Sequence, residues 1–356
     1  MLNKFYLFIK AILIIIVFFT TIFTSTTQAQ DPHFTQYYAA PMLMNPALTG
    51  FFNGDVRVSG CYRSQWPSIQ YPYITGTFSA DANAFKSYIK DGDIVGIGFT
   101  GLFDKSNNGG LSTNSLSASF SFHKLLDAQG INRLGIGAMA TYNTRILDYN
   151  KFIFGQQLTP LGFNPNLPTG ELTNGFTTNY ADYSVGIIYS AITDVSSFYC
   201  GGALYHFNQP TESFNGPIHK IATRISANVG GSFVVGESNK MFLSAAYMKN
   251  EFTSDLIFGT AFNKSLSPNA DDNYNLILGS WYRFNDAISP YIGLEYKNLR
   301  GGISYDINVS KLTPASNLRG GFELTLNYIF TQDPEANALK QTLCPRGSST
   351  LKWFGY

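Results

Sequence analysis

Apolar and polar side chains alternate along the stretch 273–330, near the C-terminal end of the chain. Turn-forming breaks at 285–287, 297–300 and 309–317 divide this stretch into four segments of about ten residues each. The apolar positions of one parity are Leu276, Leu278, Ile292, Leu294, Tyr296, Ile303, Tyr305, Phe322, Leu324, Leu326, Tyr328 and Phe330. The other parity carries Arg283, Glu295, Lys297, Arg300, Asp306, Arg319, Glu323 and Asn327. Because residues of one parity share a face, each segment predicts a strand with one apolar and one charged face.

This pattern fits two architectures. In a soluble sandwich, the apolar faces pack against each other and the charged faces meet water. In a membrane barrel, the apolar faces meet lipid and the charged faces line a lumen. The rest of the chain distinguishes between them.

The same two-residue period recurs through most of the chain from residue 56 onward. It is clearest where Leu116, Ala118, Phe120 and Phe122 alternate with serines. Further alternating runs lie at 56–62, 71–80, 93–103, 134–142, 180–191, 197–207, 221–235, 240–249 and 256–263. With the four C-terminal segments, they predict about fourteen strands. An even number closes an antiparallel barrel over 55–330, with both chain ends on the periplasmic side.

One long segment without a period, 147–178, follows the fifth predicted strand and contains three prolines. A compact domain rarely holds so long a loop unless the loop has a function. Outer-membrane barrels have long extracellular loops and short periplasmic turns. Strand parity places 147–178 on the extracellular side, in agreement with that rule.

The composition favours the membrane barrel. Charged residues make up 13% of the chain, about half of what is usual in soluble domains, and aromatic residues reach 15%. Few charges and many aromatics are typical of a sheet whose outer face meets lipid. The net charge of +1 gives no electrostatic reason to expect a nucleic-acid partner. We therefore predict an all-β fold, a transmembrane antiparallel β-barrel of about 14 strands.

Residues 1–29 have the features of a secretory signal peptide. Lys4 and Lys10 precede an apolar run that is too short to span a bilayer, and Thr27-Gln28-Ala29 is a small-residue cleavage site. The residue directly after this site is Gln30 and not a cysteine, which argues against lipoprotein processing. After Gln30, the chain has no run of about 18 apolar residues and so predicts no transmembrane helix.

The following arm, residues 30–54, has neither a helical nor a strand period, but it is rich in Phe, Tyr and Met. We expect it to be ordered. It could plug the lumen, dock a partner or form a surface strap. Glycines at predicted lumen positions would let strands curve and leave room for an arm or a peptide: Gly96, Gly98, Gly135, Gly137, Gly279, Gly293, Gly302 and Gly321.

No motif supports catalysis or a cofactor. Gly96-Ile97-Gly98-Phe99-Thr100-Gly101 matches a dinucleotide fingerprint, but it lies within an alternating strand and no helix follows. Residues 104–109 resemble the start of a calcium loop, yet Ser115 stands where the bidentate Glu belongs. The four histidines are scattered, and no G-x-S-x-G elbow occurs. We predict no enzyme, cofactor or metal.

The charges on the inner face of the C-terminal strands have two interpretations. Buried charges must pair, and adjacent strands bring partners together, so these charges could form a structural lumen network. Alternatively, they could form a polar surface that docks the tail of a secreted protein. The candidate protein-binding residues are Arg283, Glu295, Arg300, Asp306, Arg319 and Glu323.

Several short motifs, in order along nearly the whole mature chain, resemble the PorP/SprF family of Bacteroidetes outer-membrane proteins. Near the N-terminus they are Gln30-Asp31-Pro32-His33-Phe34-Thr35-Gln36-Tyr37, Asn45-Pro46-Ala47-Leu48-Thr49-Gly50 and Tyr62-Arg63-Ser64-Gln65-Trp66-Pro67. Near the C-terminus they are Trp281-Tyr282-Arg283, Gly302-Ile303-Ser304-Tyr305-Asp306-Ile307-Asn308, Ala315-Ser316 and Cys344-Pro345-Arg346. The extension 347–356 departs from the usual family terminus.

The resemblance implies a component of the type IX secretion system and its associated gliding machinery. Such members are needed for the secretion or surface attachment of large adhesins through the C-terminal domains of those cargoes. The implied partners are the cargo domain, other secretion components, a peptidoglycan-associated periplasmic protein and outer-membrane lipid. The tail 331–356 would then be periplasmic.

The sequence thus predicts a cargo-specific secretion barrel with contacts at 147–178 and at the lumen charges. The alternative is a small-solute or lipid-type transport porin, whose lumen would not be closed by the arm. An outer-membrane enzyme would require a candidate catalytic group, and the sequence offers none.

Overall fold

The structure is a computed structural model that describes residues 34–331, except 68–70, 86–88, 90–91, 171–175, 215–217, 237–238, 252, 267–273 and 312. The predicted signal peptide, the first residues of the arm and the tail after residue 331 lie outside the described residues, as does the Cys344-Pro345-Arg346 motif.

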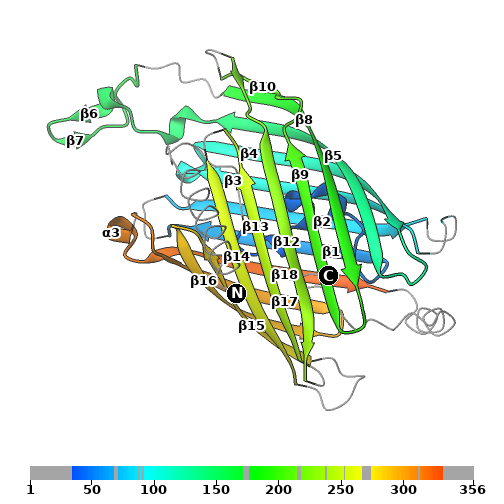
Figure 1. Ribbon diagram of the computed structural model, residues 1–356. Coiled ribbons are helices and arrows are strands. Elements are labelled where there is room, and N and C mark those ends of the chain that lie inside the picture. The colour runs from blue at the N-terminus through cyan, green and yellow to red at the C-terminus, as the bar shows by residue number, and fades with distance from the viewer. Residues whose placement is uncertain are drawn as a thin grey trace, which may run out of the picture.

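Fourteen antiparallel strands form a closed barrel in which each strand pairs with its neighbours along the chain (Figure 1). The strands are β1 (Val56–Gln65), β2 (Tyr73–Ala84), β3 (Ile94–Ser106), β4 (Leu111–Leu125), β5 (Asn132–Leu147), β8 (Phe176–Ile192), β9 (Ser196–Tyr205), β12 (Arg224–Val235), β13 (Asn239–Lys249), β14 (Ser254–Ser265), β15 (Tyr274–Arg283), β16 (Ala287–Tyr296), β17 (Leu299–Asn308) and β18 (Arg319–Phe330). The barrel closes where β1 pairs with β18, with Val56 opposite Phe330. The predicted barrel and strand number are confirmed.

The apolar side chains point outward and the polar ones inward. On β17, Ile303 and Tyr305 are 52% and 41% exposed, whereas Ser304 and Asp306 are buried. On β4, Ser117, Ser119 and Ser121 are likewise buried, while Leu116 and Phe120 are about half exposed. A soluble sandwich would show the reverse orientation. The outer face is therefore the lipid-facing surface of a membrane barrel.

The connections at the two ends of the barrel differ in length. One end, called here the loop end, has the connections 66–72, 107–110, 148–175, 206–223, 250–253, 284–286 and 309–318. The other, called the turn end, has 85–93, 126–131, 193–195, 236–238, 266–273 and 297–298. The longest connection follows the fifth barrel strand, as predicted from the sequence.

The loop end carries small elements of its own. The connection 148–175 contains η4 (Tyr149–Lys151), η5 (Gly155–Gln157) and a hairpin of β6 (Leu158–Thr159) and β7 (Gly162–Phe163), which extends beyond the rim of the barrel (Figure 1). The connection 206–223 contains the hairpin of β10 (Thr211–Glu212) and β11 (His219–Lys220). Two further short elements are η3 (Asn107–Gly109) and α3 (Thr313–Ser316). This end therefore offers most of the irregular surface of the molecule.

The N-terminal arm lies inside the barrel over residues 34–54. It folds into η1 (Tyr37–Ala39), α2 (Pro41–Met44) and η2 (Pro46–Leu48), drawn in blue within the ring of strands in Figure 1. Most of its side chains are buried, and η2 packs against β4, β5 and β8. In the described part of the chain, no helix is long and apolar enough to cross a bilayer. The sequence left open whether the arm plugs the lumen, docks a partner or forms a surface strap. The structure places residues 34–54 of the arm in the lumen.

Candidate functional site

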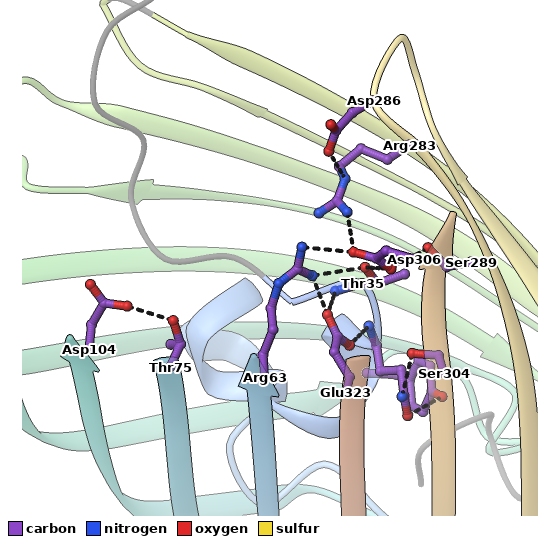
Figure 2. A network of polar contacts seen from close by, with 12 residues as sticks. Thr35, Arg63, Thr75, Asp104, Arg283, Asp286, Ser289, Ser304, Asp306 and Glu323 are labelled. Atoms are coloured by element: carbon purple, nitrogen blue, oxygen red, sulfur yellow. Dashed lines mark hydrogen bonds and ion pairs between the residues drawn. The ribbon is translucent and has the colours of Figure 1, made fainter. Parts of the chain in front are cut away.

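Four charged side chains form a cluster inside the barrel near the loop end, called here the loop-end cluster: Arg63, Arg283, Asp306 and Glu323. Asp306 accepts from Arg63 Nη2 at 2.9 Å and from Arg283 Nη2 at 2.6 Å, and Arg63 also pairs with Glu323 (Figure 2). All four side chains are at most 3% exposed. Two guanidinium groups thus neutralise two carboxylates, which is the condition for burying charge at tolerable cost.

The strand register brings this cluster together. Arg63 on β1 lies directly opposite Glu323 on β18, across the seam that closes the barrel. Asp306 comes from β17 and Arg283 from β15. Arg283 also contacts Asp286 in the adjoining connection, with 2.6 Å between Nε and Oδ2. The cluster therefore links four strands on both sides of the seam.

The first described residues of the arm are bound by this cluster. The two carboxylate oxygens of Glu323 accept the backbone N–H groups of Thr35 and Gln36, at 2.6 and 2.9 Å. Arg63 Nη1 donates to Thr35 Oγ1 at 3.0 Å, and the Thr35 hydroxyl donates to Asp306 at 3.3 Å (Figure 2). Hydrogen bonds to a carboxylate are stronger than neutral ones. The cluster thus positions the arm as well as joining the strands.

Asn45 fixes the middle of the arm to the opposite wall. Its Oδ1 accepts from Ala47 N at 2.9 Å and so caps η2, where Pro46 is the first residue. Its Nδ2 donates to the carbonyl of Ile187 at 3.0 Å. A β-carbon added at Gly186 would lie 2.0 Å from Asn45 Oδ1. The wall therefore leaves a recess that this amide fills.

A second ion pair, the turn-end pair of Arg57 and Asp81, holds the end of the arm. Asp81 Oδ2 accepts from Arg57 Nη2 at 2.6 Å and from the backbone N–H of Gly50 at 2.7 Å. Arg57 Nη2 also donates to the Leu48 carbonyl at 3.2 Å. Phe52 packs under this guanidinium, 4.7 Å from its ring centroid to Cζ. The arm is therefore anchored at both ends and in the middle.

Several of the predicted lumen glycines make the room that the arm occupies. A β-carbon at Gly96 would lie 2.1 Å from the Thr49 carbonyl oxygen, and one at Gly98 would lie 2.7 Å from Met42 Sδ. One at Gly137 would lie 2.5 Å from the backbone of Pro46. Any larger residue at these positions would push the arm away. The expectation that small lumen residues accommodate an arm therefore holds at these three positions.

The structure separates the six predicted contact residues into three groups. Arg283, Asp306 and Glu323 belong to the loop-end cluster. Glu295 and Arg300 form another buried ion pair, directly opposite each other on β16 and β17, near the turn end. Arg319 belongs to neither group, because its side chain is exposed.

The prediction that Arg319 faces the lumen is wrong because the two-residue period breaks at the start of β18. The register shifts between Asp306 and Ile307, which pair with Gly321 and Arg319 respectively. Gly320 and Gly321 are both buried, so the preceding side chain is turned outward. An extra residue in one strand is a β-bulge. It shifts the alternation by one position, so that the side chain of Arg319, before the bulge, points to the opposite face from the one predicted.

Lys297 was also assigned to the charged inner face, and this prediction is wrong too. It follows the last residue of β16, has a φ of 51° and is exposed. Its ammonium group lies over the ring of Tyr296, 5.3 Å from the centroid. The side chain of a turn residue does not follow the two-residue period of the strands on either side.

The sequence interpretation missed Arg63, Arg57, Asp81 and Asn45, all of which hold the arm. The signal was present for three of them, because Arg57 and Arg63 occupy one parity of the run 56–62 and its continuation. Asp81 follows the apolar and small residues of β2 on the inward parity. Asn45 has no such periodic context, and only its place before Pro46 points to a helix cap.

The charged side chains of the loop-end cluster bind one another and the arm. Among the described residues, no group of three or more His, Cys, Asp and Glu could hold a metal ion. Every acidic and basic group of the loop-end cluster bonds to another member or to the arm. These side chains hold one segment of the chain in place and do not converge on an open cavity.

The fold and the occupied lumen define a membrane β-barrel that holds its own N-terminal arm inside. The chain matches the family model described as "Type IX secretion system membrane protein PorP/SprF" over residues 26–328. It belongs to this family, which is a family of secretion-system membrane proteins and not of enzymes. The protein is accordingly an outer-membrane β-barrel.

Solved outer-membrane barrels show a distant likeness. The toluene transporter TbuX of Ralstonia pickettii is 13% identical with a TM-score of 0.47, and the match covers 82% of this chain and 92% of that one. The toluene transporter TodX of Pseudomonas putida is 10% identical with a TM-score of 0.46, covering 85% and 98%. A FadL homologue of Pseudomonas aeruginosa is 10% identical with a TM-score of 0.46, covering 80% and 93%. Scores this low do not bear on function. No curated protein matches the chain.

Four of the family motifs contribute residues to the loop-end cluster or to the part of the arm bound there. The first motif supplies Thr35 and Gln36, and the third and fourth motifs supply Arg63 and Arg283. The motif of β17 supplies Asp306 to the cluster. It also contains Ser304 and Asn308, which make further hydrogen bonds. Gln36 Nε2 donates to Ser304 Oγ at 2.8 Å, and Asn308 Nδ2 donates to Ser316 Oγ at 3.1 Å. Segments that lie far apart in sequence therefore serve one structural purpose.

Proposed function

We propose that this barrel is a non-enzymatic component of the type IX secretion system, needed for the secretion or cell-surface attachment of specific adhesin-type cargo. The barrel receives or retains the C-terminal domain of the cargo and is linked to the gliding machinery. Family membership supports the secretion role. The observation that carries the proposal is a lumen occupied by the arm beneath an end rich in loops.

The loop end is the extracellular face in this proposal. Outer-membrane barrels place their longer connections outside and their shorter ones in the periplasm. Here the two longest connections, 148–175 and 206–223, both lie at the loop end. A cargo held at the cell surface would meet this end first.

The connection 148–175 is the best candidate for direct contact with cargo. Its β6–β7 hairpin exposes Leu158 at 61%, Leu161 at 100% and Phe163 at 45%. In the neighbouring connection, Ile218 is 73% exposed. Exposed apolar side chains on a polar rim are typical of protein-binding surfaces. These loops therefore offer a cargo domain an apolar surface outside the membrane.

The predicted lumen charges take different parts in this proposal. Arg283, Asp306 and Glu323 act indirectly, since they hold the arm and the strands that carry the loop 309–318. Glu295 and Arg300 stabilise the wall near the turn end. Arg319 is exposed at the start of β18 and is free to meet a partner at the loop end.

Periplasmic contacts complete the proposed role. Both described ends of the barrel sequence, Val56 and Phe330, lie at the turn end. The tail 331–356 would thus leave the barrel on the periplasmic side, where other secretion components and a peptidoglycan-associated protein would be its partners. Outer-membrane lipid surrounds the apolar outer face.

The test is deletion of the gene followed by proteomics of the cell surface. We expect one or a few large adhesins to disappear from the surface and to return with the intact gene. Normal surface amounts of every adhesin would refute the proposal.

A matched pair of variants locates the contact. We expect Leu161→Asp at the loop end to lower the amount of cargo on the cell surface. Leu266→Asp, at a 52% exposed site of the turn end, should leave that amount unchanged.

Transport of small solutes is the competing function. A transport barrel needs a route through its lumen. Here the arm occupies the lumen and is bonded to the wall at Glu323, Asp81 and the carbonyl of Ile187. We therefore expect the purified barrel to conduct no solute in liposomes.

A further inference from the structure

Strand β8 is paired on only one of its two edges over its first half. Toward β5 its ladder runs along 176–191, whereas toward β9 it runs only along 185–192. The cause is a difference in length, since β8 has 17 residues and β9 has 10. At the loop end, among the described strands, no second barrel strand therefore pairs with the edge of β8 before residue 185.

The backbone groups along this edge alternate in direction. On the β9 side, the carbonyl of Tyr183 accepts from Phe207 N at 3.3 Å, and its N–H donates to Asn208 Oδ1 at 3.2 Å. Because the direction alternates along a strand, Thr177 and Asn179 point their N–H and C=O groups to the same side. Within the described part of the chain, these groups of the two residues form no hydrogen bond. Two open positions of the ladder thus remain, about 7 Å apart.

The side-chain amide of Asn208 shows which chemistry fits this edge. Its Oδ1 accepts from Tyr183 N, and its Nδ2 donates to the carbonyl of Ala181 at 2.9 Å. The amide thus offers the edge one acceptor and one donor, as the backbone of an added strand would. It covers only the part of the edge nearest to β9. The edge therefore binds amide groups, and it has room for more of them beyond Asn208.

The sequence of the open stretch lacks the features that protect sheet edges. Natural edge strands are blunted by charged side chains, by proline or by bulges. The stretch 176–181 contains no charged residue and no proline, and its register with β5 is regular. It is also rich in Phe, Thr and Tyr, which favour strands. This edge is therefore suited to pairing with a further strand.

The open edge lies above the apolar outer surface of the barrel. The outward side chains of β8 are apolar along the wall as far as Tyr183, and they are small or polar from Ala181 to Thr177. The apolar band of a barrel marks the hydrocarbon region of the membrane. The edge therefore meets water at the loop end, which is the extracellular face in the proposed orientation.

A second copy of the barrel does not fit this edge. Two copies in one outer membrane share their orientation to the membrane normal, and the strands of both tilt by about 40° in the same sense. Two β8 edges that face each other across a two-fold axis would thus cross at about 80°, whereas neighbouring strands of a sheet differ by about 20–25°. The end of β18 is distant too, because Phe330 lies at the turn end. An extended segment of another protein is the occupant that fits.

We propose that the edge of β8 over residues 177–181 binds an extended strand of the cargo's C-terminal domain, which adds to the sheet next to Asn208. This inference rests on the proposed function, because it takes its partner from there. In this mode of recognition, hydrogen bonds between main chains supply the affinity. The barrel wall then continues into the bound cargo on the outer side of the membrane.

Amide hydrogen exchange tests the contact. The probe is the C-terminal domain of the adhesin that the deletion strain loses from its surface, added to the purified barrel in detergent. We expect exchange in the segment 176–182 to slow at least about tenfold when the domain is bound, because the outward N–H groups become bonded. The connection 284–286, at the same end of the barrel, should not change. Protection of 176–182 without the domain, or none with the domain bound, would overturn the proposal.

A pair of variants separates the backbone of the edge from its side chains. Asn179→Pro removes an N–H that points away from β5, so the ladder with β5 stays intact while the edge is blocked. Asn179→Ala keeps this N–H. We expect the proline variant to bind the same domain at least about tenfold more weakly than the parent chain, and the alanine variant to bind within about twofold of it.

The outcomes distinguish this inference from the proposed function. Heat-modifiable mobility in gel electrophoresis confirms that each variant is folded, and the exchange measurement on the parent chain decides if the proline variant is not. Equal binding by the parent chain and the folded proline variant would refute the added strand and leave the proposed function standing. A domain that binds no form of the barrel would contradict both.

Discussion

The two ion-pair sites that hold the arm are built differently. The loop-end cluster draws four charged side chains from β1, β15, β17 and β18, and Asp306 joins both arginines. The turn-end pair draws one arginine and one carboxylate from the adjacent strands β1 and β2. The first therefore couples the arm to the barrel seam and to a distant strand, whereas the second anchors the arm to a single strand pair.

This difference assigns distinct roles to the two sites. A change in the loop-end cluster disturbs the wall, the seam and the arm together, because their bonds share Glu323 and Asp306. A change in the turn-end pair disturbs one local contact, and the arm stays held by Asn45 and by the loop-end cluster. Mutations at the loop-end cluster should accordingly lower the free energy of unfolding more than mutations at the turn-end pair.

The largest effect is expected for Glu323→Ala. This change leaves Arg63 partly unpaired in a buried site and removes the acceptor of two backbone N–H groups. Removing one partner of a buried ion pair costs about 3–5 kcal/mol in the free energy of unfolding. Denaturant unfolding of the barrel in detergent micelles measures it. The matched control, Arg319→Ala, removes an exposed charge of the same strand and should cost less than about 0.5 kcal/mol. Equal effects of the two variants would contradict the cluster.

A smaller effect is expected for Asp81→Asn. The amide keeps the size of the side chain and one acceptor oxygen, but it loses the charge that faces Arg57. Hydrogen bonds to charged groups contribute about 1.5–3 kcal/mol. The substitution should therefore lower the free energy of unfolding by an amount in this range, which is less than the loss in Glu323→Ala. The same unfolding measurement checks it. A larger loss than that of Glu323→Ala would reverse the comparison.

The smallest effect is expected at the middle anchor. Asn45→Ala removes the cap of η2 and the bond to the Ile187 carbonyl, at a cost of about 1–2 kcal/mol. Gly186→Ala places a methyl group against Asn45 Oδ1, and such overpacking costs about 1–3 kcal/mol.

The double variant sharpens this prediction. Because Asn45→Ala removes the atom that the new methyl group would meet, the double variant should lose less stability than the sum of the two single variants. Strict additivity in a double-mutant cycle would show that Gly186 does not form the recess for Asn45.

The alternation of side chains predicted the wall well and the plug poorly. Leu116, Phe120, Ile303 and Tyr305 face outward as predicted, because a strand has a period of two and its outer face must match lipid. Arg319 faces the other way because the bulge at Gly320–Gly321 shifts the period, and parity alone does not reveal a bulge.

The position of the arm depends on contacts that no periodic pattern encodes. Its short helices are held by single long-range bonds, such as that from Thr35 N to Glu323. The pairing of Arg63 with Glu323 depends on barrel closure, which joins the first strand to the last. The glycines at 96, 98 and 137 indicated that something would approach the wall, but they did not indicate which segment.

The conductance of the purified barrel in planar lipid bilayers tests the central claim most directly. The account predicts that the intact protein inserts without stable open-channel steps, because the arm between Thr35 and Gly50 fills the lumen and is bonded to opposite walls. Stable, porin-like conductance steps from the intact, folded barrel would contradict a closed lumen and would favour transport of solutes over the docking of cargo.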